Sequence, residues 1–404
     1  MREPGGEVSG QTVEVRSANG YPRYSAEEMA RRHRELREAV AGEDIAAVLV
    51  GGATGPIETS VQYYTNWPPL VESYALLPFD GEPVLFVRLW NHLPDARRIA
   101  VVEDVRYGGD TQDAQARHIA EVLRDRGLGR SRIGLIGPIR HADAQILRAA
   151  LPDADWVDLG AAYRGLRLVK SAEELAFTRI AADMIDRSVE ALGREIRPGL
   201  REYELARIIE DAYLAERGTN LIHFTLSTSM ADPQGCVPHQ YPPDRVIERG
   251  DVIVTEISAS FWGYAGQILR SFTVEAEPTP LYRDLYETAV AVYEDIEAVL
   301  KPGATVGEIL DRAERIHDAG FTIYDDLVHG FGGAYLPPII RTRRTRGSSH
   351  EDDFAYPAGA IVVVQPNVIT RDERAGVQVG NAIHITPEGP EVLQRYPMRF
   401  IRCS

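Results

Sequence analysis

Thr255-Glu256-Ile257-Ser258-Ala259-Ser260-Phe261-Trp262-Gly263-Tyr264-Ala265-Gly266-Gln267-Ile268-Leu269-Arg270 is the stretch that decides the fold. It follows the apolar residues 252–254 and precedes another apolar run, so its two halves are expected to form an antiparallel hairpin. A turn centred on Phe261 and Trp262 places Glu256 opposite Gln267, with their β-carbons ~4.5–5.5 Å apart. The simplest role for this pair is a hydrogen bond that fixes the register of the hairpin.

Length and composition indicate a globular protein and bound its possible partners. The chain has 404 residues, which is enough for two or three domains. Its net charge of −16 argues against nucleic acid or an anionic membrane as a main partner, because both require clustered Lys and Arg. There are only two cysteines, so no disulfide framework is implied and a cytoplasmic compartment is expected. No apolar run approaches the ~18 residues of a membrane span.

Three segments follow one another along the chain. Residues 1–24 are rich in Gly, Ser, Glu and Arg and are interpreted as a tail, or as an arm over a neighbouring subunit. In residues 25–165 helical patterns alternate with short apolar strands, such as 132–136, which predicts an α/β domain with a partly parallel sheet. In residues 166–404 long helices and strands interleave without strict alternation, which predicts an α+β domain.

Other motifs accompany the hairpin in the second domain, in a fixed order. They are Leu168-Val169-Lys170-Ser171-Ala172-Glu173-Glu174, Pro238-His239-Gln240-Tyr241, His329-Gly330-Phe331-Gly332, Val363-Val364-Gln365-Pro366-Asn367 and Gly376-Val377-Gln378-Val379-Gly380-Asn381. With the hairpin, they resemble the pita-bread family, which holds methionine aminopeptidase, prolidase, aminopeptidase P, creatinase and ectoine hydrolase. The resemblance implies a creatinase/prolidase-like N-terminal α/β domain, a pita-bread α+β catalytic domain and a homodimer.

The chain departs from this family at the metal ligands. The metallopeptidases of the family use two Asp, one His and two Glu, and the matching positions here are Glu256, Gln267, His329, Gln365 and Gly380. Hard divalent cations take carboxylate oxygens, and neutral amides contribute far less. The sequence therefore predicts no dinuclear metal site, no metal ligand and no cofactor.

The resemblance also suggests how the remaining groups act. In ectoine hydrolase a Glu replaces the first Asp and attacks the substrate, and creatinase uses a histidine as acid and base. Glu256 is thus the expected nucleophile or general base, and His329 and His239 are the expected proton carriers. Gln267 and Gln365 are expected to hold a substrate carboxylate or a developing oxyanion.

Five more residues are candidates for substrate binding, each with a simpler structural interpretation. Arg270 can orient Glu256 or form a surface salt bridge, and His223 lies in a strand whose alternation could point it to either face. The others are Tyr264 in the hairpin, Trp67 in an aromatic run of the first domain and Arg341 in a basic cluster.

The main interpretation is a metal-independent hydrolase, or a related C–N bond-cleaving or ring-opening enzyme, that does not act on peptide bonds. Its substrate would be a small amidine, guanidino, amide or amino-acid-derived compound. Two alternatives stay open: a metal-dependent Xaa-Pro peptidase with an aberrant site, and a non-catalytic binding protein with the same fold.

Overall fold

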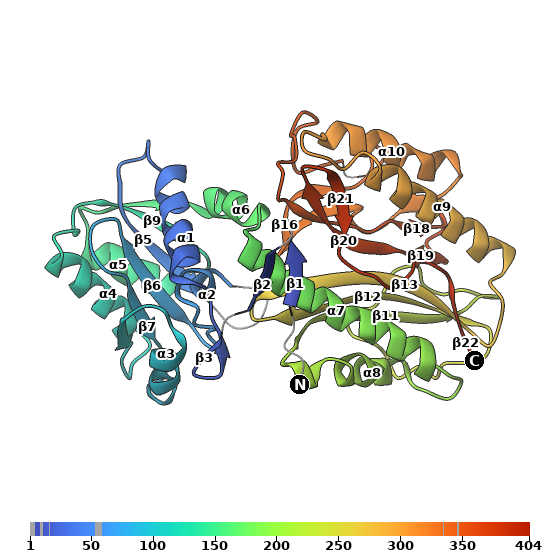
Figure 1. Cartoon of the computed structure of the whole chain (residues 1–404), viewed down its shortest axis with the longest axis horizontal. Helices are drawn as coiled ribbons and strands as arrows, with labels where there is room; N and C mark the ends of the chain where they lie inside the picture. The colour runs from blue at the N-terminus through green and yellow to red at the C-terminus, as the bar shows by residue number, and fades with distance from the viewer. Residues whose placement is uncertain (1–4, 9–10, 16, 53–58, 334, 346) are drawn as a thin grey trace. The chain divides into compact units, whose positions relative to one another are not determined.

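The computed structural model describes residues 5–8, 11–15, 17–52, 59–333, 335–345 and 347–404. The chain divides into two compact units, Met1–Arg167 and Leu168–Ser404, which are considered separately (Figure 1). The expected N-terminal tail, 1–24, lies partly outside the described residues. No described helix combines the length and apolar character needed to cross a membrane.

The N-terminal unit is an α/β domain built on a six-stranded sheet. Its elements are β1 (Gly5–Val8), β2 (Gln11–Glu14), β3 (Ser17–Ala18), β4 (Tyr21–Pro22), α1 (Ala26–Ala39), β5 (Ile45–Gly52), α2 (Ser60–Thr65), β6 (Ser73–Pro78), β7 (Val84–Val87), α3 (Leu93–Ile99), β8 (Asp104–Tyr107), α4 (Ala114–Asp125), β9 (Arg132–Ile136), α5 (His141–Ala150), β10 (Asp155–Asp158) and α6 (Gly160–Leu168).

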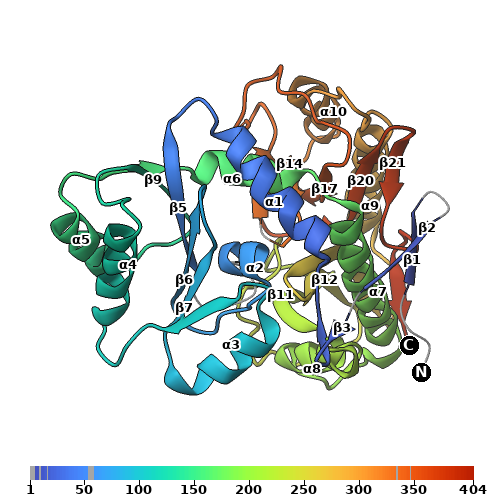
Figure 2. The ribbon, with the colours of Figure 1, turned by 60° about the vertical axis from the view of Figure 1, so that its left-hand side comes forward.

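The strand order of this sheet is β10-β9-β5-β6-β7-β8. The pairs β10–β9, β9–β5 and β7–β8 are parallel and the other two are antiparallel, so the sheet is mixed as predicted. Apolar residues of β5, β6 and β7 form one core with α4 and α5. Figure 2 shows these two helices on one side of the sheet and α2 on the other.

The C-terminal unit is the α+β domain that the sequence predicts. Its elements are α7 (Ala172–Glu195), α8 (Leu205–Asp211), β11 (Thr219–Ser229), β12 (Asp251–Phe261), β13 (Tyr264–Val274), α9 (Pro280–Glu297), α10 (Val306–Asp318), β14 (Thr322–Ile323), β15 (Val328–Phe331), β16 (Tyr335–Ile340), β17 (Ile361–Val364), β18 (Asn367–Ile369), β19 (Gly376–Gln378), β20 (Gly380–Thr386), β21 (Gly389–Val392) and β22 (Ile401–Cys403).

The main sheet of this unit runs β11-β12-β13-β20-β17-β15-β16, with β21 paired to β20 and β22 to β13. Helix α7 packs against β12 and β13, and α9 packs against α10 and the strands β17 to β19. Figure 1 shows α7 and α8 on one side of these strands and α9 and α10 on the other. The strands that carry the sequence motifs are therefore held between two layers of helices.

Helix α7 is fixed closely against the hairpin. Ser171 caps its N-terminus by accepting a hydrogen bond from Glu174 N at 3.1 Å, and Glu174 Oε2 accepts one from Ser171 N at 2.8 Å. The other Glu174 oxygen accepts a hydrogen bond from the Tyr264 hydroxyl. A β-carbon at Gly266 would lie 2.7 Å from Ala182 N, so only glycine permits this approach of the helix to β13.

The register of the hairpin differs from the prediction by two positions. Glu256 pairs with Leu269, and Gln267 pairs with Ser258. The turn consists of Trp262 and Gly263, which both have positive φ, 49° and 85°, as the tight two-residue turns of hairpins require. Gln267 is therefore diagonal to Glu256 and not opposite it, although both side chains lie on the same face of the sheet.

Candidate functional site

Four predicted site residues from four strands meet on one face of the main sheet. Glu256 lies on β12 and Gln267 on β13, while His329 lies on β15 and Gln365 directly follows β17. His329 pairs with Val363 across β15 and β17, which brings it close to the end of β17. All four side chains are buried.

Two hydrogen bonds and one short contact join these side chains into one chain of groups. Gln267 Nε2 donates to Glu256 Oε1 at 2.9 Å and to Gln365 Oε1 at 2.8 Å. His329 Nε2 lies 3.3 Å from the same oxygen of Gln365. We call these four residues the polar chain. The hydrogen bond between Glu256 and Gln267 that the sequence suggests is thus present, despite the shifted register.

The His329 ring is oriented by its own backbone. Its Nδ1 lies 2.9 Å from Gly330 O, which can only accept, so Nδ1 carries a proton. Burial lowers the pKa of His329, which favours the neutral ring. In that ring Nε2 is an acceptor and makes no hydrogen bond to Gln365 Oε1, which is an acceptor too. A proton taken up at Nε2 would be stabilised by Gln365 Oε1. His329 is therefore placed to act as a base.

The Glu256 carboxyl group is held largely protonated at neutral pH. Burial, followed by the negative charges of Asp325 and Asp326, raises its pKa to about 8, against the opposing effect of hydrogen bonds from Gln378 and Gln267. A carboxyl group in this state can donate a proton near neutral pH, which a carboxylate with an ordinary pKa cannot do.

Asp325, Asp326 and Gln378 are site residues that the sequence interpretation missed. The two aspartates lie in the loop between β14 and β15, and Gln378 ends β19. Gln378 Nε2 donates to Asp325 Oδ2 at 3.1 Å. A signal was available, since two adjacent acids stand three and four residues before His329, but a sequence does not show which way such a loop turns.

His239 belongs to a different group of contacts. Its Nδ1 lies 2.9 Å from Glu202 Oε1, and the other Glu202 oxygen accepts hydrogen bonds from Ser227 N and Oγ, both at 2.6 Å. The hydrogen bond to Glu202 raises the pKa of His239. Within the described part of the chain this histidine makes no hydrogen bond to the polar chain, and its catalytic role stays a prediction.

Arg270 points to the opposite face of the sheet from Glu256. It pairs with Thr255 across the hairpin and is fully buried. Its guanidinium donates to four acceptors at 2.6–2.9 Å, which are Leu269 O, Gly380 O, Asn381 Oδ1 and Tyr396 O. The expectation that Arg270 orients Glu256 or binds substrate is therefore wrong, because its side chain holds the opposite face of the sheet together.

Tyr264 and His223 are also turned to structural contacts. Tyr264 is buried and its hydroxyl donates to Glu174. His223 pairs with Ile257, so it lies on the other face from Glu256, and its Nε2 is 3.0 Å from Tyr213 OH. Burial lowers the pKa of His223 to about 4, so the ring is neutral. We find no place for either residue in the site.

The two remaining candidates differ from each other. Arg341 forms an ion pair with Asp326, with 2.7 Å between Nη2 and Oδ1, so it contacts the acidic side of the site and not a free surface. Trp67 is buried within the N-terminal unit. Its role in substrate binding stays a prediction.

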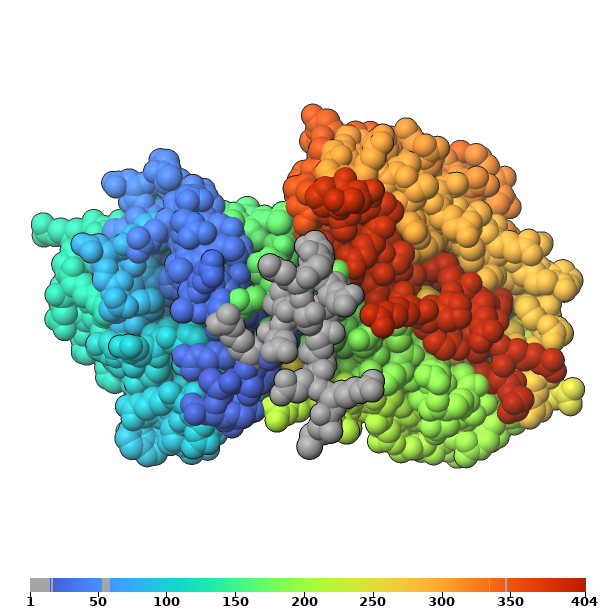
Figure 3. Space-filling view, in the orientation of Figure 1, coloured from blue at the N-terminus to red at the C-terminus, as the bar shows by residue number. Residues whose placement is uncertain are grey.

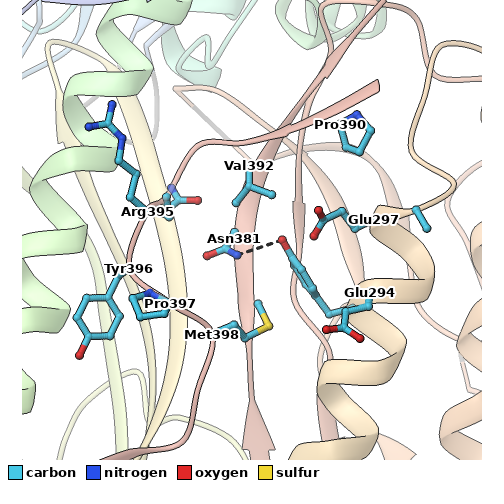
Figure 4. Close-up of a pocket in the computed structure, with 12 residues that line it drawn as sticks. Glu294, Glu297, Asn381, Pro390, Val392, Arg395, Tyr396, Pro397 and Met398 are labelled. Atoms are coloured by element: carbon cyan, nitrogen blue, oxygen red, sulfur yellow. Dashed lines mark hydrogen bonds between the residues drawn. The ribbon is translucent and has the colours of Figure 1, made fainter. Parts of the chain in front are cut away.

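A pocket of about 450 Å³ lies between α9 and residues 390–398, which we call the C-terminal segment. Figure 3 shows this segment, in red, on the surface beside α9. Asn381 and Tyr293 line the pocket and are joined by a 3.0 Å hydrogen bond (Figure 4). Because Asn381 pairs with Ile268 and Val364, it faces away from the polar chain, and this pocket is not the site described above.

Comparison with known proteins places the chain in a family. The model of metallopeptidase family M24 matches residues 176–387, which is more than half of the chain. The chain belongs to metallopeptidase family M24. The model of the creatinase/prolidase N-terminal domain matches residues 32–169.

Three proteins similar to this M24 chain are distant in sequence and match most of its length. It is 23% identical to an Xaa-Pro dipeptidase of Pyrococcus furiosus, over 83% of this chain and 91% of the relative. It is 24% identical to a creatinase of a Bacillus species, over 93% of this chain and 92% of the creatinase. The structure is similar to the crystal structure of the prolidase from Pyrococcus horikoshii, with a TM-score of 0.76 and 21% identity. The similarity covers 92% of this chain and 100% of the prolidase chain. These likenesses confirm the predicted family and fold.

The residues of this M24 chain do not fit a dinuclear metal centre. Two of the five ligand positions carry amides, and the Gln267 amide is already bonded to Glu256 and Gln365. A β-carbon at Gly380 would lie 2.4 Å from Val364 O and 2.8 Å from Leu269 Cδ1, so a longer side chain has no room there. Among the described residues no three His, Cys, Asp or Glu side chains are arranged to hold a metal ion.

The comparisons correct the main prediction about function. The prediction of a metal-independent hydrolase is wrong, because the chain matches a metallopeptidase family and its relatives and structural neighbours include Xaa-Pro dipeptidases and prolidases. These findings fit the alternative better, a metal-dependent Xaa-Pro peptidase with an aberrant site. They support a hydrolase, and they give no support to the expectation that peptide bonds are not its substrate. The metal ligands expected of a metallopeptidase are largely replaced in this chain, and for this reason we call the site aberrant.

Proposed function

We propose that this chain hydrolyses the peptide bond of Xaa-Pro dipeptides at an aberrant M24 site formed around the polar chain. The observation that carries the proposal is the convergence of Glu256, Gln267, His329 and Gln365 into one polar chain on one face of the sheet. These are the positions that the family resemblance assigns to the reaction centre. The activity named for the relatives supplies the substrate class.

Three groups of the polar chain have properties that suit amide hydrolysis. His329 Nε2 would accept the proton of an attacking water, because the ring is neutral and oriented through Nδ1. Within the described contacts Gln365 Nε2 donates no hydrogen bond, so it is available to the oxygen of the scissile carbonyl. The protonated Glu256 would give its proton to the proline nitrogen as the C–N bond breaks.

The proton balance closes through the same residues. One proton moves from water to His329, and one moves from Glu256 to the leaving nitrogen. The net change inside the site is a proton moved from Glu256 to His329. Its return through water restores the starting state.

The direct test is proline release from alanyl-proline, glycyl-proline and methionyl-proline. Each is incubated with the purified protein in the presence of Mn²⁺, Co²⁺ or Zn²⁺ and in the presence of a chelator, which also determines the metal requirement. We expect proline release by the native chain and a loss of about a hundredfold or more in Glu256→Gln and in His329→Gln. A folded native protein that releases no proline under any of these conditions would contradict the proposal and favour a non-catalytic binding protein.

A further inference from the structure

The pocket between α9 and the C-terminal segment carries opposite charges on its two walls. Glu294 and Glu297 stand on the α9 wall and Arg395 stands on the other wall, with Asn381 between them (Figure 4). None of these three charged side chains forms an ion pair with another described residue. The volume of about 450 Å³ lies in the range of about 300–1,000 Å³ that is typical of small-molecule sites. The charges of the pocket are thus available to a ligand.

The base of the pocket is held in place by buried hydrogen bonds. Asn381 Nδ2 donates to Tyr293 OH at 3.0 Å, and Asn381 Oδ1 accepts from Arg270 Nη2 at 2.9 Å. Burial raises the pKa of Tyr293, and the nearby Glu297 carboxylate raises it further, against the opposing effect of the hydrogen bond from Asn381. Both polar ends of Asn381 are therefore used within the protein, and a ligand must be held by the two walls.

One buried donor beside the base of the pocket lacks an acceptor. Gln394 lines the pocket and is 5% exposed. Its Oε1 accepts from Ala382 N at 2.7 Å, which fixes the amide beside Asn381, and its Nε2 has no hydrogen-bond partner among the described atoms. A buried amide donor without an acceptor is rare in folded proteins. This donor indicates that the group bound here carries an oxygen acceptor on the side of the C-terminal segment.

The pocket is apolar between its charged walls. Val392 and Met398 line this part, above and below Asn381 in the view of Figure 4. A ligand that reaches both walls therefore needs an aliphatic stem between a cationic end and an oxygen-bearing end.

We propose that this pocket binds a basic amino acid, with its guanidinium group at Glu294 and Glu297 and its carboxylate at Gln394 Nε2 and Arg395. Residues three apart on a helix have β-carbons ~5–6 Å apart, so the two carboxylates can bind two edges of one guanidinium. A guanidinium has five N–H donors and no acceptor, which suits a wall of carboxylates.

The proposed site is separate from the polar chain. Asn381 pairs with Ile268 and Val364, so the pocket lies on the opposite face of the main sheet from Glu256. The inference therefore goes beyond the proposed function and does not depend on it.

Calorimetric titration of the native chain with L-arginine tests the site. L-Citrulline is the matched control ligand, because it keeps the stem and the carboxylate but has no charge on its side chain. We expect L-arginine to bind about tenfold more tightly or better, since charge-assisted contacts are lost with the neutral ligand. Equal affinity for the two compounds, or no binding of L-arginine by the folded chain, would overturn the proposal.

Two variants test the two walls separately. Glu297→Gln is expected to weaken binding of L-arginine about fivefold or more. Gln394→Glu keeps the acceptor for Ala382 N but repels the ligand carboxylate, so a similar loss is expected for L-arginine. 4-Guanidinobutylamine, which lacks the carboxylate, should lose no affinity in Gln394→Glu. An affinity for L-arginine that is unchanged in either variant would overturn the proposal.

The controls use acids outside the pocket. Glu287→Gln, at an exposed position of α9, should change the affinity for L-arginine less than about twofold. Thermal unfolding of each variant shows that the fold is retained. Glu256→Gln, which is expected to lose proline release, should still bind L-arginine as the native chain does, so the proposed function can fail while this site stands. Loss of L-arginine binding in folded Glu256→Gln would place the ligand at the reaction centre and overturn the proposal.

Discussion

The two faces of the β12–β13 hairpin bury ionisable groups in opposite ways. On one face the Arg270 guanidinium donates to four carbonyl oxygens, so the buried charge is met by fixed dipoles. On the other face Glu256 accepts a hydrogen bond from the Gln267 side chain and is repelled by Asp325 and Asp326. A buried charge that several acceptors surround can be kept in a fold, whereas a buried acid that is partly bonded and repelled is ready to change its protonation.

Replacing Glu256 is the strongest way to break this contrast. Its pKa is raised from 4.5 to about 8, so the stability that protonated Glu256 contributes is fully present below pH 4.5 and is lost as the pH rises through 8. Glu256→Gln removes this loss and keeps the acceptor for Gln267. We expect its stability relative to the native chain to rise by about 4 kcal/mol between pH 5 and pH 8.5.

Urea unfolding of both proteins at several pH values measures this difference. Asp372→Asn, which replaces an exposed acid, is the control and should leave the pH dependence close to that of the native chain. A Glu256→Gln variant whose relative stability does not change with pH would show that Glu256 is ionised without penalty in the folded protein.

Replacing Arg270 tests the other face. Arg270→Met keeps much of the side-chain volume but leaves Gly380 O and Tyr396 O without their donors in a buried region. We expect a loss of about 3 kcal/mol in the free energy of unfolding, because buried acceptors are left unpaired. Arg402→Met, at an exposed arginine paired with Glu277, is the matched control and should cost less than about 1 kcal/mol. If both variants lose the same small amount, Arg270 is not a structural cation.

The order of the motifs is enough to predict the family, the fold and the meeting of the polar chain, because each motif fixes a position on a strand. The sequence does not show which face Arg270 and His223 occupy. A bulge in β11 between Asn220 and Ile222 interrupts the alternation just before His223. The hairpin register differs from the prediction because the turn falls at Trp262 and Gly263. The sequence does not show this turn, since a non-glycine residue with positive φ is hard to foresee.

Asp325 escapes prediction for a different reason. Its effect on Glu256 acts through space from a loop, and no periodicity describes a loop. The chemical character of the site depends on such long-range charges as much as on the residues of the motifs. The effect of Asp325 on Glu256 can therefore be recognised only in the three-dimensional structure.

Gly380 contacts groups of both faces, because its carbonyl oxygen accepts from Arg270 and its Cα lies beside Gln365. Replacing it therefore tests how closely the two faces are coupled. A β-carbon there would lie 2.4 Å from Val364 O and 2.9 Å from the Cα of Gln365, so Gly380→Ala must displace the strand that carries Gln365. We expect a loss of about 2 kcal/mol in the free energy of unfolding, as for other overpacked sites, and a weaker polar chain. Gly165→Ala, on a helix with no atom within 4 Å of the added carbon, is the control and should be neutral or stabilising. Equal stability of the two variants would mean that β17 and β20 adjust freely.

His239 gives the smallest expected effect, because its charge is met by a partner and its side chain is partly exposed to solvent. The hydrogen bond to Glu202 raises its pKa, so the stability it contributes is present below pH 6.5 and is lost as the pH rises through the raised value. With 42% of the side chain exposed, solvent screening keeps this contribution below about 1 kcal/mol. His239→Gln should therefore destabilise the chain slightly more at pH 5.5 than at pH 8.5, as measured by urea unfolding. A pH dependence as large as that expected for Glu256→Gln would contradict this interpretation. His239 would then resemble Glu256, a buried ionisable group that is only partly hydrogen-bonded.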